Sequence, residues 1–538
     1  MTAAPEGHAP EDIARTELPG RVDVLVVGAG LSGIGAAHRI REVNPGIELA
    51  ILEARAATGG TRDLFRYPGV RSDSDMFTLS FPFRPWEGRK AIAAGGDILD
   101  YIRATAHESG LEELIHTGHR AVAASWSSDE QEWTVEVDTP TGRRQVRAGF
   151  IHPGSGYYNY EQAHDAGFEG VEDFRGTVVH PQFWPQDLDH AGKRVVVIGS
   201  GATAVTVVPA MAETAAHVTM LQRTPSYVFG QPGVDPFVQM LRRRLSPAAV
   251  QKAARVKNLG MQYFLYELSR RRPKAANKIA LTELRRHLPK DVVDEHFTPP
   301  YNVWDQRLCA VPDGDLYSVI RRGRAEVVTG HIDRFVPEGV RLTDGRVVEA
   351  DIVVTATGLL LKLLGGMTFT VDGEPVAMER AYAYRGLMLA GVPNVAMTVG
   401  YVNASWTLRA DLVSRYVASL IAHMRDRGPG IAVPVAPDGM TAGPILDLTA
   451  GYVQRVVSAF PKVGDRAPWT MPQNYVKDKF AFARADVTTD MHFVPVGAKG
   501  ETLPQGAAAP AELALPGTSS NVDGSPGDVR DETLEVAR

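Results

Sequence analysis

The segment VDVLVVGAGLSG occupies residues 22–33 and determines how the first part of the chain folds. Its apolar, β-branched start is typical of a buried parallel strand. A helical stretch over 34–41 and a second apolar run over 49–53 complete a βαβ unit. Glycines in the turn let backbone N–H groups and the start of the helix approach a pyrophosphate, and three are present: Gly28, Gly30 and Gly33. The segment therefore predicts a dinucleotide-binding unit in an α/β fold.

The same pattern returns as RVVVIGSGATA at residues 194–204, followed by a helix and an apolar strand over 218–223. Its turn residues are Gly199, Gly201 and Ala204, and alanine is an accepted variant of the third glycine. Further strands are expected at 134–137, at 144–151 and at 350–355, the last closing one of two sheets. The fold class is α/β, with two Rossmann-like dinucleotide-binding domains and a helical insertion.

The second strand of each unit ends in a residue that distinguishes the two nucleotides. Glu53 follows Gly28 by 25 residues, and a carboxylate there accepts hydrogen bonds from ribose hydroxyls and repels a 2′-phosphate, which favours FAD or NAD. Arg223, followed by Thr224, instead offers a guanidinium that suits the 2′-phosphate of NADPH. A surface ion-pair role for Arg223 is the alternative. An FAD site beside an NADPH site implies hydride transfer from nicotinamide to flavin.

Composition excludes several other classes of protein. The 538 residues carry a net charge of −6, which gives no general reason to expect nucleic acid as a partner. The single cysteine, Cys309, excludes an intrachain disulfide and a cysteine-rich metal cluster, and no metal site is expected. It also excludes transfer of electrons to a cysteine pair, which leaves O2 as the acceptor. Neither a signal peptide nor a membrane span is evident, so a cytoplasmic location is expected.

The chain divides into regions of different character. We expect a disordered leader over 1–20 and a first part of the FAD-binding domain over 21–165. An NADPH-binding domain follows over 166–345, with a basic helical insertion at about 235–296. A second part of the FAD-binding domain, with the substrate side, is expected over 346–496 and a disordered tail over 497–538. Within the insertion, residues 241–290 hold 14 Lys or Arg against two acids. This segment is interpreted either as a cationic surface with weak peripheral affinity for membranes or as a solvated cover or subunit contact.

The segment FRGTVVHPQFWP at residues 174–185 matches the FxGxxxHxxxWP fingerprint of Baeyer–Villiger monooxygenases. In that family His180 and its neighbours, including Trp184, couple nucleotide binding to domain movement. The chain further resembles class B flavoprotein monooxygenases of the ethionamide-activating and long-chain alkane type. This resemblance covers roughly residues 22–480 and depends on four phrases: DLFRYPGVRSD at 63–73, GYYNY at 156–160, WDQRLC at 304–309 and NASW at 403–406.

The resemblance implies an activity and its site. FAD, reduced by NADPH, would react with O2 to a C4a-peroxyflavin that converts a small lipophilic ketone into an ester or lactone, and S-oxidation of a sulfur-containing substrate is a natural second activity. Arg307 matches the catalytic arginine and Asp73 the acid that pairs with it. The resemblance also implies further cofactor-binding residues: Gly60, Thr61, Asp63, Tyr67, Arg71, His180, Trp184 and Gln306. Candidate pocket walls are Trp304, Trp406 and Trp469.

The chain departs from the family pattern at two places. Arg62 replaces a tryptophan after the first βαβ unit, and His152-Pro153-Gly154 replaces an apolar strand end. Both departures predict incomplete coupling of NADPH oxidation to oxygenation. Two alternatives therefore stay open: an N/S-oxygenating or uncoupled NADPH oxidase flavoprotein without ketone activity, and a catalytically weak flavin-binding protein.

Overall fold

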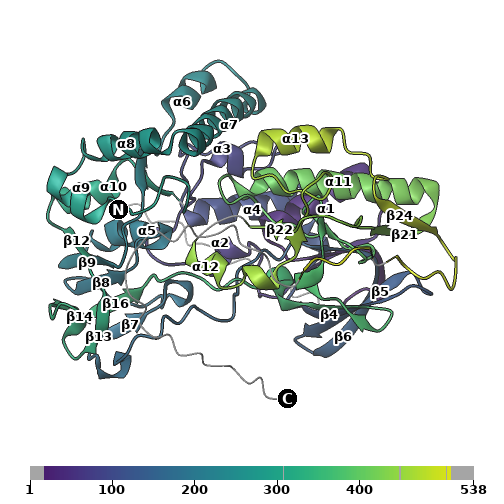
Figure 1. Ribbon diagram of the computed structural model, residues 1–538, viewed down its shortest axis with the longest axis horizontal. Helices are drawn as coiled ribbons and strands as arrows, with labels where there is room; N and C mark the ends of the chain where they lie inside the picture. The colour runs from purple at the N-terminus through teal and green to yellow at the C-terminus, as the bar shows by residue number, and fades with distance from the viewer. Residues whose placement is uncertain (1–16, 307, 447–449, 505, 511–538) are drawn as a thin grey trace, which may run out of the picture.

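The computed structural model describes residues 17–306, 308–446, 450–504 and 506–510, and Figure 1 shows two sheets side by side, each with its own helices. The larger sheet contains the first glycine motif. In this sheet β1 (Arg21–Val27) lies parallel to β2 (Leu49–Glu53) on one side and to β6 (Gly142–Pro153) on the other. The remaining strands extend the sheet in the order β18-β17-β4-β5-β6-β1-β2-β3, with bounds β3 (Ile115–Thr117), β4 (Arg120–Ser127), β5 (Glu132–Thr139), β17 (Thr368–Val371) and β18 (Glu374–Pro375).

The second sheet contains the second glycine motif, and its five strands are all parallel. Their order is β12-β9-β8-β16-β7, with bounds β7 (Thr177–Val179), β8 (Arg194–Ile198), β9 (His217–Gln222), β12 (Ala325–Thr329) and β16 (Ile352–Thr355). Helix α5 (Ala202–Met211) follows the glycine turn. The apolar strands are buried because helices and a small three-stranded sheet cover them, as the sequence pattern predicts for a parallel sheet.

Two expected boundaries are wrong. Strand β16 lies between β8 and β7, so the second sheet is complete only after residue 355, and the boundary expected at 345 would divide it. The expected tail from 497 onward also starts too early. Leu503 and Ala509 are buried, and the Ala509 N–H donates to the Arg380 carbonyl. Apolar side chains thus hold the start of this segment on the body, while 1–16 and 511–538 lie outside the described residues.

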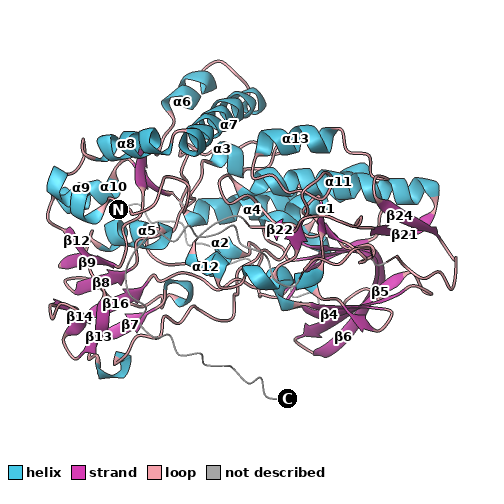
Figure 2. Cartoon of the chain, viewed as in Figure 1, coloured by secondary structure: helices cyan, strands magenta, loops and turns pink. Residues whose placement is uncertain are grey.

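Helices surround the first sheet and form the insertion of the second domain. Helices α1 (Leu31–Val43) and α11 (Trp406–Arg427) pack together beside β1, and the basic insertion forms α6 (Pro236–Arg242), α7 (Pro247–Arg271), α8 (Pro273–Leu284) and α9 (Lys290–His296) (Figure 2). The other helices are α2 (Thr61–Leu64), α3 (Met76–Leu79), α4 (Gly95–Glu108), α10 (Asp315–Arg321), α12 (Gly451–Gln454) and α13 (Tyr475–Ala483). None of the helices described is both long and apolar enough to cross a bilayer.

Short strands complete the structure outside the two main sheets. They are β10 (Val228–Gln231) with β11 (Cys309–Pro312); β13 (Ile332–Val336), β14 (Gly339–Leu342) and β15 (Val347–Glu349); β19 (Ala383–Tyr384) with β20 (Met388–Leu389); β21 (Pro429–Pro434) with β24 (Met491–Pro495); and β22 (Gly443–Pro444) with β23 (Lys462–Val463). Parallel pairing of β10 with β11 brings Cys309 beside Val228, so the strand after the WDQRLC phrase is anchored in the second domain.

Candidate active site

One continuous cavity of about 1810 Å³ extends between the carboxyl ends of β1 and β8. It is lined by the first glycine turn at Gly28 and Gly30 and by the second at Gly199 and Gly201. Ligands of open α/β sheets bind in the crevice outside the carboxyl ends of the strands. The fold therefore brings both predicted nucleotide motifs to a single site.

The first glycine turn has the shape that a pyrophosphate requires. Gly28 has φ +105°, and a Cβ on it would lie 3.0 Å from the Gly154 carbonyl oxygen. Gly33 does not line the cavity, and a Cβ there would lie 1.7 Å from the Gly28 carbonyl oxygen, so its role is close packing of helix and strand. At Gly30 the nearest atom, Gly60 Cα, lies 3.5 Å from such a Cβ, which leaves the backbone open to a ligand. This cradle fits the phosphates of a dinucleotide.

Glu53 lines the cavity at the end of β2 and is 4% exposed. Its carboxylate accepts hydrogen bonds from the N–H groups of Ala29 and Arg55, both at 2.9 Å. Burial raises the pKa of Glu53, whereas these two backbone N–H groups oppose the shift. The carboxylate is thus fixed at the place where the sequence predicts contact with a ribose, and that contact stays a prediction.

Asp63 does not line the cavity, whereas the resemblance predicts that it binds a cofactor. Its buried carboxylate binds three guanidinium groups: Arg55 at 2.6 Å, Arg66 at 2.8 Å and Arg103 at 3.5 Å. Of these, Arg55 lines the cavity. Asp63 therefore positions a cationic side chain at the site and does not itself face the ligand space.

The loop after β2 contains further residues that the resemblance predicts to bind a cofactor. Gly60 and Thr61 line the cavity, and the Thr61 hydroxyl lies 2.7 Å from the hydroxyl of Tyr160. Tyr67 also lines it, and burial is the main cause that raises its pKa to about 12. Arg71 forms an ion pair with Asp315 of α10, which ties this loop to the second domain.

The second glycine turn repeats the geometry of the first. Gly199 has φ +142°, and a Cβ there would lie 2.4 Å from the Ala356 carbonyl oxygen. A Cβ at Gly201 would meet no atom within 4 Å, so this position is open to a ligand. Ala204 is buried in the helix behind the turn and does not line the cavity.

Arg223 and Thr224 line the cavity immediately after β9, as predicted. Arg223 is exposed and has no carboxylate within ion-pair distance in the part of the chain that the structure describes. The Thr224 carbonyl accepts a hydrogen bond from the Ser200 hydroxyl at 2.9 Å, which joins this corner to the glycine turn. A guanidinium without an acidic partner suits a phosphate ligand.

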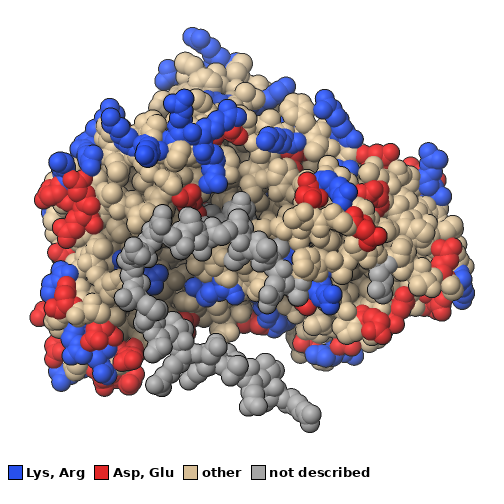
Figure 3. Space-filling view, in the orientation of Figure 1, with Lys and Arg blue, Asp and Glu red and all other residues tan. Residues whose placement is uncertain are grey.

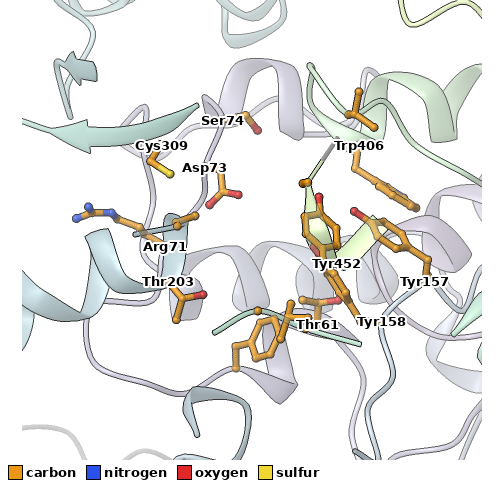
Figure 4. Close-up of a pocket in the computed structure, with 18 of the residues that line it drawn as sticks. Thr61, Arg71, Asp73, Ser74, Tyr157, Tyr158, Thr203, Cys309, Trp406 and Tyr452 are labelled. Atoms are coloured by element: carbon orange, nitrogen blue, oxygen red, sulfur yellow. The ribbon is translucent and has the colours of Figure 1, made fainter. Parts of the chain in front are cut away.

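Of the two predicted catalytic residues, the structure describes Asp73. Asp73 lines the cavity, and Figure 4 shows its carboxylate pointing into it, with Arg71 and Thr203 on one side and the aromatic rings of Tyr157, Tyr158 and Trp406 on the other. Arg307 lies outside the described residues. Its neighbours Gln306 and Leu308 both line the cavity.

The fingerprint residues lie behind the cavity wall. His180 and Trp184 do not line the cavity; Trp184 packs against the core of the second sheet. His180 follows β7 and accepts a hydrogen bond from the Gln182 N–H at 3.2 Å. The Gln182 side chain in turn donates to the Asn159 carbonyl at 2.8 Å, in the segment that links the two domains. The placement corrects the cofactor-binding assignment of His180 and Trp184 and agrees with the linker role implied by the family.

The sequence predicts Trp406 as a wall of the pocket, and the structure confirms that it lines the cavity, but the sequence does not predict the contribution of Tyr157 to that wall. Tyr157 and Trp406 line the cavity and stack with ring centroids 4.9 Å apart. Trp304 also lines it, as predicted, whereas Trp469 is 0% exposed and belongs to the core. Tyr157 belongs to the phrase GYYNY and Trp406 to the phrase NASW, but nothing in either phrase indicates that the two rings stack.

The two departures from the family pattern lie at different depths. Arg62 lines the cavity and donates a hydrogen bond to the Arg71 carbonyl at 3.2 Å. His152 is fully buried in β6, where Pro153 is the last residue and Gly154 donates to the Val27 carbonyl. The missing N–H of Pro153 therefore falls at the strand end, where the following residue continues the ladder. The effect of both departures on coupling stays a prediction.

Comparison with known proteins agrees with this architecture. A family described as "Flavin-binding monooxygenase-like" matches residues 81–261, and "NAD(P)-binding Rossmann-like domain" matches residues 26–87. Among solved structures, an oxidized steroid monooxygenase bound to NADP superposes with a TM-score of 0.69 at 23% identity, covering 88% of this chain and 100% of that one. Cyclohexanone monooxygenase with bound ε-caprolactone gives a TM-score of 0.69 at 20% identity, over 88% and 99% of the two chains. These structures confirm the predicted fold.

Curated relatives are considerably more similar in sequence. FAD-containing monooxygenase EthA of Mycobacterium tuberculosis is 48% identical over 85% of this chain and 94% of its own length. A protein described as "Probable FAD-binding monooxygenase AlmA", of Acinetobacter baylyi, is 42% identical over 86% of this chain and 94% of its own length. The resemblance predicted from the fingerprint is thereby confirmed, and the chain belongs to the family of FAD-containing monooxygenases.

Proposed function

We propose that this chain is an FAD- and NADPH-dependent monooxygenase that inserts one oxygen atom of O2 beside the carbonyl of a small lipophilic ketone, giving an ester or lactone. The observation that carries the proposal is the single cavity that both glycine turns, Arg223 and Asp73 share. When bound, NADPH supplies the hydride and FAD activates O2. We assign FAD to the larger sheet and NADPH to the second sheet.

The chain's own residues bind and orient the two nucleotides. The turns at Gly30 and Gly201 offer open backbone to the two pyrophosphates, and Glu53 accepts hydrogen bonds from the ribose of FAD. Arg223 recognises the 2′-phosphate that distinguishes NADPH from NADH. Both nucleotides are then held in one space, as transfer between them requires.

Arg307 and Asp73 serve the oxygenation step in this proposal. Addition to a ketone places negative charge on its oxygen, and a fixed guanidinium lowers the free energy of that charge in a site that excludes water. Asp73 lines the cavity, and in this proposal it is the acid that pairs with the Arg307 guanidinium. The rings of Tyr157, Trp304 and Trp406 give an apolar surface that receives a lipophilic substrate and excludes water.

A sulfur-containing lipophilic compound is the second substrate class of the proposal, since oxidation at sulfur creates no alkoxide that needs a cation. The enzyme is cytoplasmic in this proposal, with weak peripheral association with membranes. The two substrate classes therefore differ in whether their oxidation needs the positive charge of Arg307.

The test measures three quantities for each variant: anaerobic flavin reduction by NADPH, NADPH consumed under air, and ester or sulfoxide formed. Arg307→Ala is expected to lower ester formation by about 100- to 1000-fold while flavin reduction continues. Asp73→Asn should lower it less, and the exposed Asp187→Asn should have no effect. Ester formation unchanged in Arg307→Ala would contradict the mechanism. NADPH consumption without either product in the wild-type protein would favour the uncoupled oxidase instead.

A further inference from the structure

Helices α6 to α8 carry an exposed surface that is both apolar and cationic, which we call the α6–α8 surface. Of the 14 large apolar side chains exposed in the described structure, eight belong to it, from Met240 to Ile279. They are Met240, Leu245, Val256, Met261, Tyr263, Phe264, Leu265 and Ile279. Phe264 is 60% exposed and Val256 68% exposed, so these side chains lie well out in solvent. Exposed apolar side chains gathered on neighbouring helices are typical of an interaction site.

Lysine and arginine surround these apolar side chains. Several cations of the segment pair with acids, but seven are exposed and have no carboxylate within 4.0 Å among the described residues: Arg243, Arg244, Lys252, Arg272, Lys274, Lys278 and Lys290. Figure 3 shows Lys and Arg gathered over these helices along the upper edge, whereas Asp and Glu lie mainly elsewhere in this view. Residues 241–290 contribute +12 in a chain of net charge −6, so the rest carries −18. The positive charge is therefore concentrated on this surface.

Helix α7 has a protein-facing side and a solvent-facing side. Residues at four-residue spacing share one face of a helix, so Val250, Ala254, Asn258 and Gln262 lie on the protein-facing side. Val250 and Ala254 are buried against the body of the protein, whereas Asn258 and Gln262 line the active-site cavity. On the opposite side, Val256 is exposed to solvent.

Met261 and Leu265 follow Ala254 and Asn258 by seven residues, so they lie near the protein-facing side of α7. Both line the cavity, and they are 56% and 44% exposed. Helix α7 therefore carries part of the α6–α8 surface and also forms part of the cavity wall.

We propose that the α6–α8 surface docks on an anionic lipid bilayer, which brings the part of the cavity wall formed by α7 close to the membrane. Charge complementarity selects this occupant, because exposed unpaired cations bind anionic headgroups while Val256, Tyr263 and Phe264, on the solvent-facing side of α7, enter the interface. The binding itself does not depend on the reaction catalysed. The consequence that substrate enters from the bilayer rests on the monooxygenase function proposed above.

Flotation of the full-length, FAD-loaded protein with vesicles tests the docking. We expect co-flotation with vesicles of phosphatidylcholine and phosphatidylglycerol at low salt, a several-fold smaller bound fraction at moderate salt, and little with phosphatidylcholine alone. Absence of flotation with the anionic vesicles at low salt would overturn the proposal.

Matched variants identify the surface. The triple variant Lys252→Gln, Lys274→Gln, Lys278→Gln should lower the bound fraction several-fold, whereas Arg175→Gln, Lys193→Gln, Arg322→Gln, which removes the same charge elsewhere, should not. Val256→Ser with Phe264→Ser should lower it as well, against Val43→Ser with Val347→Ser as control. Equal losses in test and control variants would contradict the assignment. Sedimentation of the same variants would show whether the surface instead binds a second copy of the chain, and a dimer lost only in the α6–α8 variants, without flotation, would overturn the lipid proposal.

A separate assay tests whether membrane docking helps a lipophilic substrate to reach the enzyme. A lipophilic ketone dissolved in anionic vesicles should be oxidised several-fold faster by the wild-type protein than by the Lys252/Lys274/Lys278 variant, with equal rates on a water-soluble ketone. Flotation without any ketone oxidation would retain the docking and reject the proposed reaction.

Discussion

Tyr157 stacks on Trp406 with ring centroids 4.9 Å and ring planes 21° apart, and the Trp406 indole N–H donates to the Ser32 hydroxyl at 2.7 Å. The three residues come from the segment after β6, the start of α11 and the first glycine motif. Aromatic stacking contributes about 1 kcal/mol beyond the area that it buries. The pair thus braces the turn that is expected to hold FAD.

Trp406→Ala should lower the FAD content of the purified protein, because it removes both the stack and the hydrogen bond to Ser32. Trp406→Phe keeps a ring for Tyr157 and should retain most of the flavin. The absorbance of flavin relative to protein after gel filtration measures both. An FAD content in Trp406→Ala equal to that of the wild-type protein would show that the brace is unimportant.

Local sequence signals predicted the nucleotide units well, because the glycines act within one turn and the strands pair with near neighbours. Gly28, Gly30, Gly199 and Gly201 accordingly line the cavity as expected. Predictions failed where a role depends on distant segments. Asp63 was assigned to the cofactor, although its carboxylate is engaged by Arg55, Arg66 and Arg103.

The aromatic wall and the domain boundary illustrate the same limit. Nothing local relates Tyr157 to Trp406, which are 249 positions apart in the chain. Strand β16 enters the second sheet between β8 and β7, a crossover that depends on tertiary pairing. Leu503 was assigned to a disordered tail from composition, but its side chain is buried against the core, a contact with distant residues that composition does not reveal.

Arg223→Ala should make the enzyme less selective for NADPH over NADH. A charge-assisted hydrogen bond contributes about 2 kcal/mol, so the KM for NADPH should rise roughly 30-fold while the KM for NADH changes little. Steady-state kinetics of flavin reduction with each nucleotide provides the measurement. The exposed Arg175→Ala is the control, and a parallel rise for NADPH and NADH in Arg223→Ala would contradict recognition of the 2′-phosphate.

His152 should make the protein sensitive to acid. Burial lowers its pKa from 6.5 to about 4. As the pH falls below about 6.5 the unfolded chain takes up a proton that the folded protein does not accept, so stability is lost as the pH drops toward 4. The loss is about 3 kcal/mol over the full range and about 2 kcal/mol by about pH 5.

Urea unfolding at about pH 7 and about pH 5 tests this linkage. The loss of stability between the two pH values should be smaller in His152→Gln than in the wild-type protein, and unchanged in the control His190→Gln. Burial also lowers the pKa of His38, His180 and His296, so part of the acid sensitivity should remain. If His152→Gln loses as much stability as the wild-type protein, protonation of His152 does not destabilise the folded state.

The buried ion pair of Arg409 on α11 and Asp478 on α13 should be the most sensitive single interaction outside the cofactor turns. Arg409 is 0% exposed and Asp478 2% exposed, and the Tyr401 hydroxyl donates to the same carboxylate at 2.6 Å. Tyr401 lines the cavity, so the pair supports the wall from behind. Asp478→Ala leaves a buried guanidinium without its carboxylate and should lower the free energy of unfolding by about 3–5 kcal/mol.

The control is Asp138→Ala, which removes one partner of the exposed pair with Arg143 and should cost at most about 1 kcal/mol. Replacing both buried partners, Arg409→Met with Asp478→Leu, should recover much of the loss, because no buried charge then remains unpaired. Urea unfolding followed by fluorescence measures all three. If Asp478→Ala cost no more than Asp138→Ala, water would have to reach Arg409, and the wall behind Tyr401 would be far more open than its burial indicates.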